Sequence, residues 1–340
     1  MGTDASSDYM PLAIATYCDS MARTKLHIME NEKVQVSLDE TSEGLRLDVV
    51  LSRLLPEISR NAIQRLIRSG EITVCGEGFS PSRKASIGDI IEYSSEILQD
   101  KIMPEDIPLD ILYEDQHILV INKAAGLVVH PNAHEKCGTL VNALLAHCPD
   151  ADFQEMMDND ERPGIVHRLD KFTTGVLVVA KNRQASDRLR EDFKQHLMRK
   201  TYLAIISGRP KCLSGDIRLP ISRDPVSKTK MCVLPNGKEA WTEYRTVAFK
   251  NGISVVKIRL HTGRTHQIRV HFAAMGNPVL GDVVYGMKPE LEPYHPPRQM
   301  LHAWKLVFRH PVSNKSMQFC APLPDDFLEA LAALGISAPS

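Results

Sequence analysis

The sequence predicts an α+β protein in which a small domain precedes a larger domain with a mixed, largely antiparallel sheet. First, 340 residues with 43% hydrophobic content are enough for one small core and one large core. Second, segments rich in β-branched and aliphatic residues recur along the chain, as strands do. Third, these segments do not alternate strictly with helical patterns, which favours a mixed or antiparallel sheet.

The composition excludes several classes of protein. Charged residues make up 24% of the chain, as in ordinary globular proteins. No apolar run approaches the ~18–20 residues of a membrane span, and the N-terminus lacks the basic and apolar regions of a secretory signal. The 7 cysteines include no pair with C-x-x-C spacing. We therefore expect a cytoplasmic monomer with reduced thiols, without a disulfide scaffold, a structural zinc site or a membrane partner.

The formal net charge of −1 conceals a strong asymmetry along the chain. Residues 162–311 hold 27 Lys and Arg against 11 Asp and Glu, a net charge of +16. Residues 95–161 hold 3 against 14, a net charge of −11. A basic segment of this size favours a polyanionic partner such as nucleic acid. Cations scattered over a solvated surface are the alternative, and composition leaves both readings open.

The changes in pattern along the chain predict four parts. Residues 1–40 have no sustained period, so we expect an N-terminal extension that is loosely attached. A small α+β domain is predicted over residues 42–94 and a linker of polar and charged residues over 95–106. The larger, strand-rich domain is predicted over residues 107–330.

The small domain begins with two predicted helices. Leucines and a valine at helical spacing between Leu47 and Leu55 predict the first helix. Ser59 stands at an N-cap position and Gly70 at a stop position, which delimits the second helix. Short strand-like segments follow at Glu71–Val74 and Ile90–Tyr93.

The second predicted helix carries three arginines that can contact RNA phosphates, Arg60, Arg65 and Arg68. An ordinary exposed face is the alternative. The segment resembles the S4 RNA-binding domain in Arg46-Leu-Asp, Ser59-Arg60, Gln64-Arg-Leu-Ile-Arg-Ser-Gly70 and Ile72-Thr-Val74. It departs from that pattern at Cys75-Gly76, where the family usually has Asn-Gly. The resemblance implies an RNA-binding module and leaves the contacts of that turn open.

The larger domain contains further strand and helix signals. Leu189, Phe193 and Leu197 recur at a spacing of four and predict a helix within residues 185–199. Thr265 is expected to cap a helix that runs through Ala274 and stops at Gly276. The predicted strands include Ile118–Ile121, Val176–Val179, Tyr202–Ser207 and Ile253–Leu260.

Asp170 is the first residue to consider for chemistry. It lies in Gly164-Ile-Val-His-Arg-Leu-Asp170-Lys-Phe-Thr-Thr-Gly175, on a connection that leads into the strand-like segment Val176–Val179. Rigid flanking strands can hold a loop side chain for catalysis. The alternative is a structural role, in which Asp170 bonds its own backbone in a turn or forms one partner of a salt bridge. From the residues alone, the structural role is the better-supported interpretation.

A second constellation is Leu260-His-Thr-Gly-Arg264-Thr-His-Gln-Ile-Arg269-Val-His-Phe. A turn followed by a helix N-terminus and two arginines forms a corner that attracts anions. His266 and His271 raise the question of a metal site. They lie five residues apart, or about 140° of rotation at 3.6 residues per turn, so they do not share a helix face. We therefore expect no metal here.

Lys200-Thr-Tyr202-Leu-Ala opens a strand after a basic helix. A tyrosine there can stack on a flat base or pack in the core, and the residues alone leave both possibilities open.

Together, in this order, the motifs of residues 112–328 resemble the RluA family of RNA pseudouridine synthases. The matching pieces are Tyr113-Glu-Asp115, Val120-Ile-Asn-Lys-Ala-Ala-Gly126, His130-Pro131, Gly138-Thr-Leu-Val-Asn142, His167–Gly175, Lys200–Ala204, His261–His271 and Gly276–Gly286. The His-Arg-Leu-Asp form separates this family from relatives that carry Gly-Arg-Leu-Asp. With an S4 domain in front, the chain further resembles the branch of this family that modifies large-subunit ribosomal RNA.

The resemblance implies a role for several residues. Asp170 would be the catalytic residue, either as a nucleophile on the sugar or as a base that removes a sugar proton. Arg269 would pair with Asp170, Arg168 would fill the space left by a flipped base, and Tyr202 would stack on that base. Less specific roles are implied for Leu280 and Ile268 in the apolar pocket and for Arg264 and His167 as RNA contacts. The partner would be RNA, and no cofactor is needed.

Two other functions remain to be weighed. A non-catalytic RNA-binding protein could use the small domain and the basic surface, although the motif residues for catalysis are intact. A deaminase would need H-x-E and P-C-x-x-C, which the sequence lacks. A hydrolytic glycosidase usually pairs two carboxylates, whereas the motif regions 162–180 and 260–272 offer only Asp170.

Overall fold

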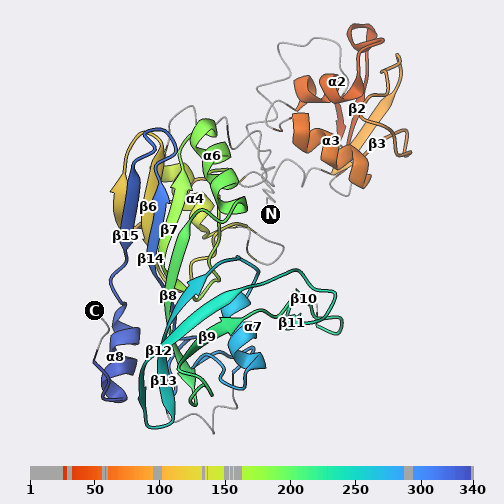
Figure 1. Cartoon of the computed structure of the whole chain (residues 1–340). Helices are drawn as coiled ribbons and strands as arrows, with labels where there is room; N and C mark the ends of the chain where they lie inside the picture. Colours follow the sequence, from red (N-terminus) through yellow and green to blue (C-terminus); the bar gives the residue numbers. More distant parts are fainter. Residues whose placement is uncertain are drawn as a thin grey trace, which may run out of the picture. The chain divides into compact units, whose positions relative to one another are not determined.

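The computed structural model describes residues 26–28, 33–55, 58, 60–94, 102–131, 135, 137–148, 153, 156, 163–227, 229–286 and 294–337. The chain forms two compact units, Met1–Lys101 and Ile102–Ser340 (Figure 1). The predicted linker spans this boundary. Its residues 95–101 lie outside the described part of the chain, as does Ser59, and its residues 102–106 belong to the second unit.

The described residues of the first unit form a four-stranded antiparallel sheet, of strand order β1-β2-β4-β3, and two α-helices. Helix α2 begins at Leu47 because the leucines and valines of this segment share one face, and that face is buried. Gly70, with φ +79°, follows the end of α3, as predicted. The elements are β1 (Leu26–Ile28), β2 (Lys33–Ser37), η1 (Glu40–Ser42), α2 (Leu47–Leu54), α3 (Arg60–Ser69), β3 (Ile72–Val74) and β4 (Ile90–Ser94).

The prediction of a loose extension over residues 1–40 has to be corrected for residues 33–40, whereas residues 1–25 and 29–32 lie outside the described part of the chain. Strand β2 pairs with β4 from Lys33↔Ser94 onward, and Val34, Val36 and Leu38 are buried in the core of the first unit. The alternation of valines in β2 is only five residues long, too short to stand out as a period. Its partner strand lies far along the chain, so no local signal announces the pairing.

The second unit is built on a nine-stranded sheet of order β5-β6-β7-β14-β8-β13-β12-β9, with β15 on β14. Strands β7 and β14 run parallel, and the other neighbouring pairs run antiparallel. This confirms the predicted mixed, largely antiparallel sheet. The strands are β5 (Ile111–Glu114), β6 (Ile118–Lys123), β7 (Thr174–Ala180), β8 (Arg199–Ser207), β9 (Ser214–Ile217), β12 (Thr242–Lys250), β13 (Ile253–Leu260), β14 (Leu301–Arg309) and β15 (Ser316–Cys320).

Alternating side chains of the sheet divide the core of the second unit into two faces. Helices α4 (Leu140–His147) and α7 (Gln267–Ala274) pack against one face. Helices α6 (Arg183–Lys194) and α8 (Asp325–Ala333) pack against the other face. Figure 1 shows α7 and α8 on opposite sides of the sheet. A short hairpin, β10 (Ile221–Arg223) with β11 (Met231–Val233), lies beside α7.

Two helix boundaries differ from the predictions. Helix α6 ends at Lys194, because His196 adopts a left-handed φ of +57°, and Leu197 is consequently exposed. Helix α7 is not capped by Thr265. His266 occupies its N-cap, and the Gln267 side chain accepts the Arg264 N–H instead. Gly276, with φ +77°, does end α7 as predicted.

Among the helices of the described residues, none has the length and apolar character needed to cross a membrane.

Candidate active site

The motif residues of the second unit converge on one pocket of about 270 Å³. Its walls come from the loop before β7, the start of β8, the end of β13 and the start of α7. Seven of the predicted residues line it: His167, Arg168, Asp170, Tyr202, Arg264, Ile268 and Arg269. Asp170 is the only carboxylate among the described residues of the lining, which also holds Lys200 and Arg264. A lone carboxylate in a basic, partly apolar pocket suits an anionic ligand with a flat, apolar part.

Asp170 is held by its backbone and by one arginine. Its carbonyl oxygen accepts the Thr173 N–H at 3.0 Å, which closes a turn just before β7. Its Oδ2 lies 3.0 Å from Arg269 Nη1, and the carboxylate is 16% exposed. The sequence left a turn role and a catalytic role open, and the turn is present in the structure. The side chain faces the pocket with its Oδ1 free of the arginine.

Arg269 has a second carboxylate partner that sequence reasoning missed. Asp282, which is fully buried, accepts from Arg269 Nε at 2.6 Å and from Nη2 at 2.9 Å. Burial lowers the pKa of Arg269. The hydrogen bonds that Arg269 donates to Asp282 and Asp170, together with the charges of these two residues, outweigh burial and raise the pKa. Asp282 also accepts the Val284 and Tyr285 N–H groups, and its pKa is lowered despite burial. The signal available was its place in Gly276–Gly286.

Two further side chains form a chain of contacts next to Asp170. His266 Nε2 lies 3.9 Å from Asp170 Oδ1, and its Nδ1 lies 2.8 Å from the Tyr285 hydroxyl. That hydroxyl accepts the Met231 N–H of strand β11 at 2.8 Å. The Arg269 guanidinium lies over the Tyr285 ring, 5.1 Å from its centroid. His266 and Tyr285 were not assigned roles from the sequence.

Tyr202 and Ile268 provide apolar surface in the pocket. Tyr202 lies in β8 and is only 8% exposed, and Ile268 lies in the first turn of α7. Burial, and then the charge of Asp170, raise the pKa of Tyr202, so its hydroxyl stays protonated. The ring is therefore a neutral, flat surface at the pocket wall.

The rim of the pocket carries cations. Arg168 is exposed, whereas Arg264 is half-buried and donates from Nε to the Glu239 carbonyl at 2.9 Å. Lys200, which sequence reasoning did not single out by role, donates to the Thr262 carbonyl at 3.2 Å. Burial and the neighbouring Arg264 lower the pKa of Lys200 to about 8. An anion at this rim would raise the pKa of Lys200 again and so favour its charged form.

Two predicted residues are placed differently from the expectation. His167 lines the pocket, but its Nε2 accepts the Val178 N–H at 3.0 Å and its ring stacks on Phe193. Burial lowers its pKa to about 3, so it is neutral and carries no charge toward phosphate. Leu280 is fully buried in the core next to α8, on the other face of the sheet, and does not form the pocket floor. Successive side chains of an extended segment point to opposite faces of a sheet, and the sequence did not resolve which face Leu280 takes.

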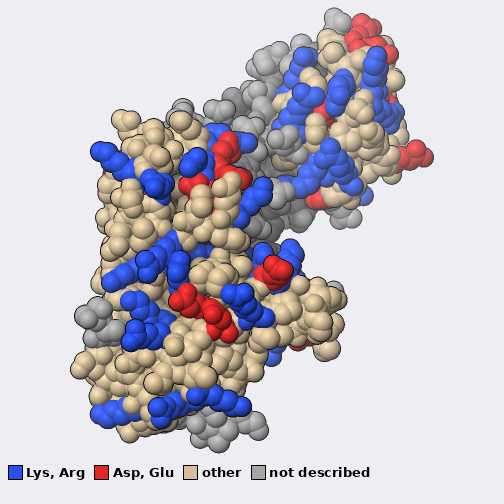
Figure 2. Space-filling view, in the orientation of Figure 1, with Lys and Arg blue, Asp and Glu red and all other residues tan. Residues whose placement is uncertain are grey.

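Lys and Arg side chains gather on the face of the first unit that carries α2 and α3 (Figure 2). Arg60, Arg65 and Arg68 are all exposed there. Arg60 also pairs with the buried Asp48 at 3.0 Å, so part of its charge is neutralised within the unit. The three arginines thus form a basic helix face, with Arg60 anchored at its base.

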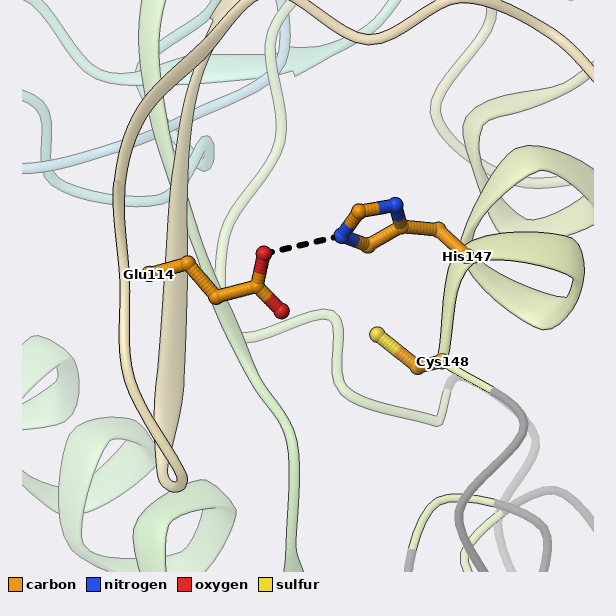
Figure 3. A group of neighbouring side chains, drawn as sticks. All are labelled: Glu114, His147 and Cys148. Atoms are coloured by element: carbon orange, nitrogen blue, oxygen red, sulfur yellow. Dashed lines mark hydrogen bonds and ion pairs between the residues drawn. The ribbon is translucent and has the colours of Figure 1, made fainter.

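A second group of polar side chains lies away from the pocket and contains metal-ligating atoms (Figure 3). Glu114 Oε2 lies 2.9 Å from His147 Nε2, and the Cys148 thiol is close by. Lys181 Nζ lies 2.6 Å from the other carboxylate oxygen. A metal would have to break the contact between Glu114 and His147, and the ion pairs already account for the arrangement. The group ties β5 to α4 and to the end of β7.

Comparisons with known proteins agree with this geometry. The family described as RNA pseudouridylate synthase matches residues 117–274, and the S4 domain matches residues 45–91. An RNA pseudouridine synthase of Synechocystis sp. is 41% identical over 314 residues, which are 89% of this chain and 94% of the relative. Ribosomal large subunit pseudouridine synthase D of Nitrosomonas europaea is 40% identical over 90% of this chain and 89% of the relative.

A solved structure agrees as well. Human RNA Pseudouridylate Synthase Domain Containing 1 superposes with a TM-score of 0.53 and 30% identity, covering 68% of this chain and 89% of that chain. An S4 domain in front of a catalytic domain of this kind defines an RNA-modifying enzyme. Within that class, the chain belongs to the family of RNA pseudouridine synthases.

Proposed function

We propose that this enzyme converts specific uridines of large-subunit ribosomal RNA, free or in a ribosome precursor, into pseudouridine, with Asp170 as the catalytic residue. The observation that carries the proposal is the pocket in which Asp170 is the lone carboxylate among the described lining residues. The substrate class is supported by relatives that carry the name ribosomal large subunit pseudouridine synthase D and match most of the chain. We further propose that the enzyme acts as a monomer in the cytoplasm.

The reaction exchanges one bond of the nucleotide for another. The bond between uracil N1 and the sugar C1′ breaks, and a bond between uracil C5 and C1′ forms. The proton on C5 leaves and N1 gains a proton, so no net oxidation, hydrolysis or phosphate transfer takes place. One carboxylate is sufficient to begin this sequence, either by attack on C1′ or by removal of a sugar proton. The proposal leaves both routes open.

Arg269 orients the Asp170 carboxylate. Its Nη1 contacts Asp170 while its other two nitrogens are bound by Asp282. The arginine cannot swing away to follow a substrate phosphate, because that would leave Asp282 buried without its partner. The Asp170 side chain thus has a fixed direction before RNA arrives.

Access to the pocket requires the target uridine to leave its stack, which costs a few kcal/mol in a folded RNA. Arg168 is exposed at the pocket rim and can occupy the space that the base vacates. Tyr202 and Ile268 offer the neutral apolar surface on which the flipped uracil can lie. Arg264 and Lys200 at the rim can contact the flanking phosphates.

The exposed arginines of α3 provide a second RNA-binding surface. We propose that Arg60, Arg65 and Arg68 contact the RNA backbone and so contribute to affinity and to the choice of site. Contacts of this kind add affinity without reading sequence by themselves.

The direct test is a map of pseudouridines in large-subunit ribosomal RNA. Purified RNA lacking the modification is incubated with the enzyme, treated with a carbodiimide that marks pseudouridine, and read by reverse transcription. New marks at a small set of uridines are the expected result. RNA without new marks would overturn the substrate class, and release of free uracil would indicate a glycosidase instead.

A further inference from the structure

His266 has an unusual backbone for a residue in a pocket wall. It occupies the N-cap of α7 with φ +56° and ψ +20°, in the left-handed region, and its side chain makes no capping bond there. A non-glycine residue in a sparsely populated region of this kind costs about 1–3 kcal/mol and persists only where its surroundings hold it. The conformation places the imidazole in the pocket lining, with Nε2 3.9 Å from Asp170 Oδ1.

The neighbours of His266 determine which ring nitrogen carries the proton. The Tyr285 hydroxyl accepts the Met231 N–H at 2.8 Å, so its own proton is available for His266 Nδ1, also at 2.8 Å. Burial raises the pKa of Tyr285, which keeps that proton on the hydroxyl. A neutral imidazole that accepts at Nδ1 carries its proton on Nε2. The N–H then faces Asp170.

Burial of the ring favours the neutral form. Burial lowers the pKa of His266, and the cations of Arg269 and Arg168 act in the same direction, against Asp170 and Asp282. A second full ion pair would further reduce the reactivity of the Asp170 carboxylate. A neutral donor beside Asp170 can orient the carboxylate without forming such a pair.

We propose that His266 is a positioning residue, held by Tyr285 with its proton on Nε2, that orients Oδ1 of Asp170 while Arg269 holds Oδ2. The inference rests on the proposed uridine isomerisation and adds to it. The two oxygens of the carboxylate become inequivalent, since one is bound to a cation and the other faces a neutral donor. The 3.9 Å separation is too long for a hydrogen bond, and such contacts commonly tighten when the substrate closes the site.

Two amide substitutions test the roles of the two ring nitrogens of His266 separately. In His266→Asn, the amide takes the place of Nδ1 and can meet Tyr285 but does not reach Asp170. In His266→Gln, the amide nitrogen takes the place of Nε2 and can donate toward Asp170. Asparagine also tolerates the left-handed region better than histidine does, so His266→Asn is expected to be at least as stable to heat as the wild type.

The kinetic test measures the single-turnover rate and the RNA dissociation constant of the wild type and both variants. We expect His266→Asn to be about 10–100-fold slower than the wild type, as for other residues that orient a reactive group, and His266→Gln to recover most of that loss. Both should bind RNA as the wild type does. A wild-type rate in His266→Asn, or equal losses in the two variants, would overturn the inference.

A spectroscopic test does not depend on activity. Two-bond ¹H–¹⁵N spectra of histidine-labelled full-length enzyme report the tautomer, and the His266 signals are identified by their loss in His266→Gln. The expected result is an Nε2–H tautomer in the wild type and a mixture in Tyr285→Phe. An Nδ1–H tautomer in the wild type would overturn the inference. If the wild type forms no pseudouridine at all, the proposed function fails, whereas the spectra still decide the position of the proton.

Discussion

Arg269 and Asp282 form a two-pronged buried ion pair, with Nε to Oδ2 at 2.6 Å and Nη2 to Oδ1 at 2.9 Å. This pairing leaves only Nη1 of the guanidinium for Asp170, at 3.0 Å. The arginine therefore acts as a fixed bridge between a fully buried carboxylate and the one that faces the pocket. The orientation of Asp170 depends on a residue that lies outside the pocket lining.

Removal of Asp282 should be costly. In Asp282→Ala, Arg269 would be left half-paired and buried, and loss of one partner of a buried pair lowers the free energy of unfolding by about 3–5 kcal/mol. Urea denaturation would measure the loss. Asp187→Ala is the matched control, because Asp187 pairs with Arg183 on the exposed surface and such pairs contribute about 0–1 kcal/mol. Equal stability of the two variants would contradict the bridging role.

RNA affinity should depend on pH through Lys200. Its pKa is lowered to about 8 by burial and by Arg264, so its positive charge is lost as the pH rises through that value. We expect the dissociation constant for a short uridine-containing RNA to rise between about pH 7 and 9 at fixed ionic strength. Lys200→Arg should remove most of this dependence, since arginine stays charged. An unchanged pH dependence in Lys200→Met would show that another group is responsible.

The arginines of α3 should contribute through charge. If Arg65 and Arg68 each neutralise one phosphate, the double alanine variant should reduce the slope of log K against log salt by about 2 and weaken binding similarly for all sequences. The double lysine variant keeps both charges and should keep the slope. Binding titrations over a range of salt concentrations measure both quantities. A slope that does not change in the alanine variant would remove these residues from the interface.

The first unit should lose stability in acid through Asp48. Hydrogen bonds from Arg46, and then from Gln64 and Arg60, lower its pKa to about 2 against the opposing effect of burial. A lowered pKa stabilises the fold above the unfolded value near 4, and the effect disappears as the pH falls toward 2. Asp48→Asn should therefore cost about 1–2 kcal/mol at neutral pH and little at pH 2. Hydrogen exchange of the β3 and β4 amides would measure the difference in stability between the wild type and Asp48→Asn. A difference that does not change with pH would contradict the role of these hydrogen bonds.

Much of the fold could be predicted from local patterns. The periodic leucines of α2, the stop glycines Gly70 and Gly276, and the aliphatic segments of β6, β7, β8 and β13 all carry local signals that the structure bears out. Strand β2 was missed because five alternating residues are weak evidence until β4 is known to be their partner. The end of α6 was missed because a left-handed His196 leaves no clear mark in the sequence.

The candidate site was predictable in part. The motifs supplied Asp170, Arg269, Tyr202 and Arg168, and these four line one pocket. Asp282 was not assigned, because a buried partner of an arginine is recognised only through the long-range contact itself. Leu280 was misplaced because its direction depends on the face of the sheet that its segment covers. The family resemblance therefore pointed to residues that line the pocket, and tertiary contacts identified the groups that hold them.

The central claim is that Asp170 carries out the chemistry, and its isosteric amide tests it most directly. Asp170→Asn keeps the shape of the side chain and removes the charge that faces the pocket. Asp187→Asn, an exposed aspartate of α6, serves as the control. Pseudouridine formed on large-subunit ribosomal RNA is measured together with RNA binding for both variants. We expect Asp170→Asn to bind RNA and form no pseudouridine while the control matches the wild type, and conversion by Asp170→Asn at the wild-type rate would contradict the account.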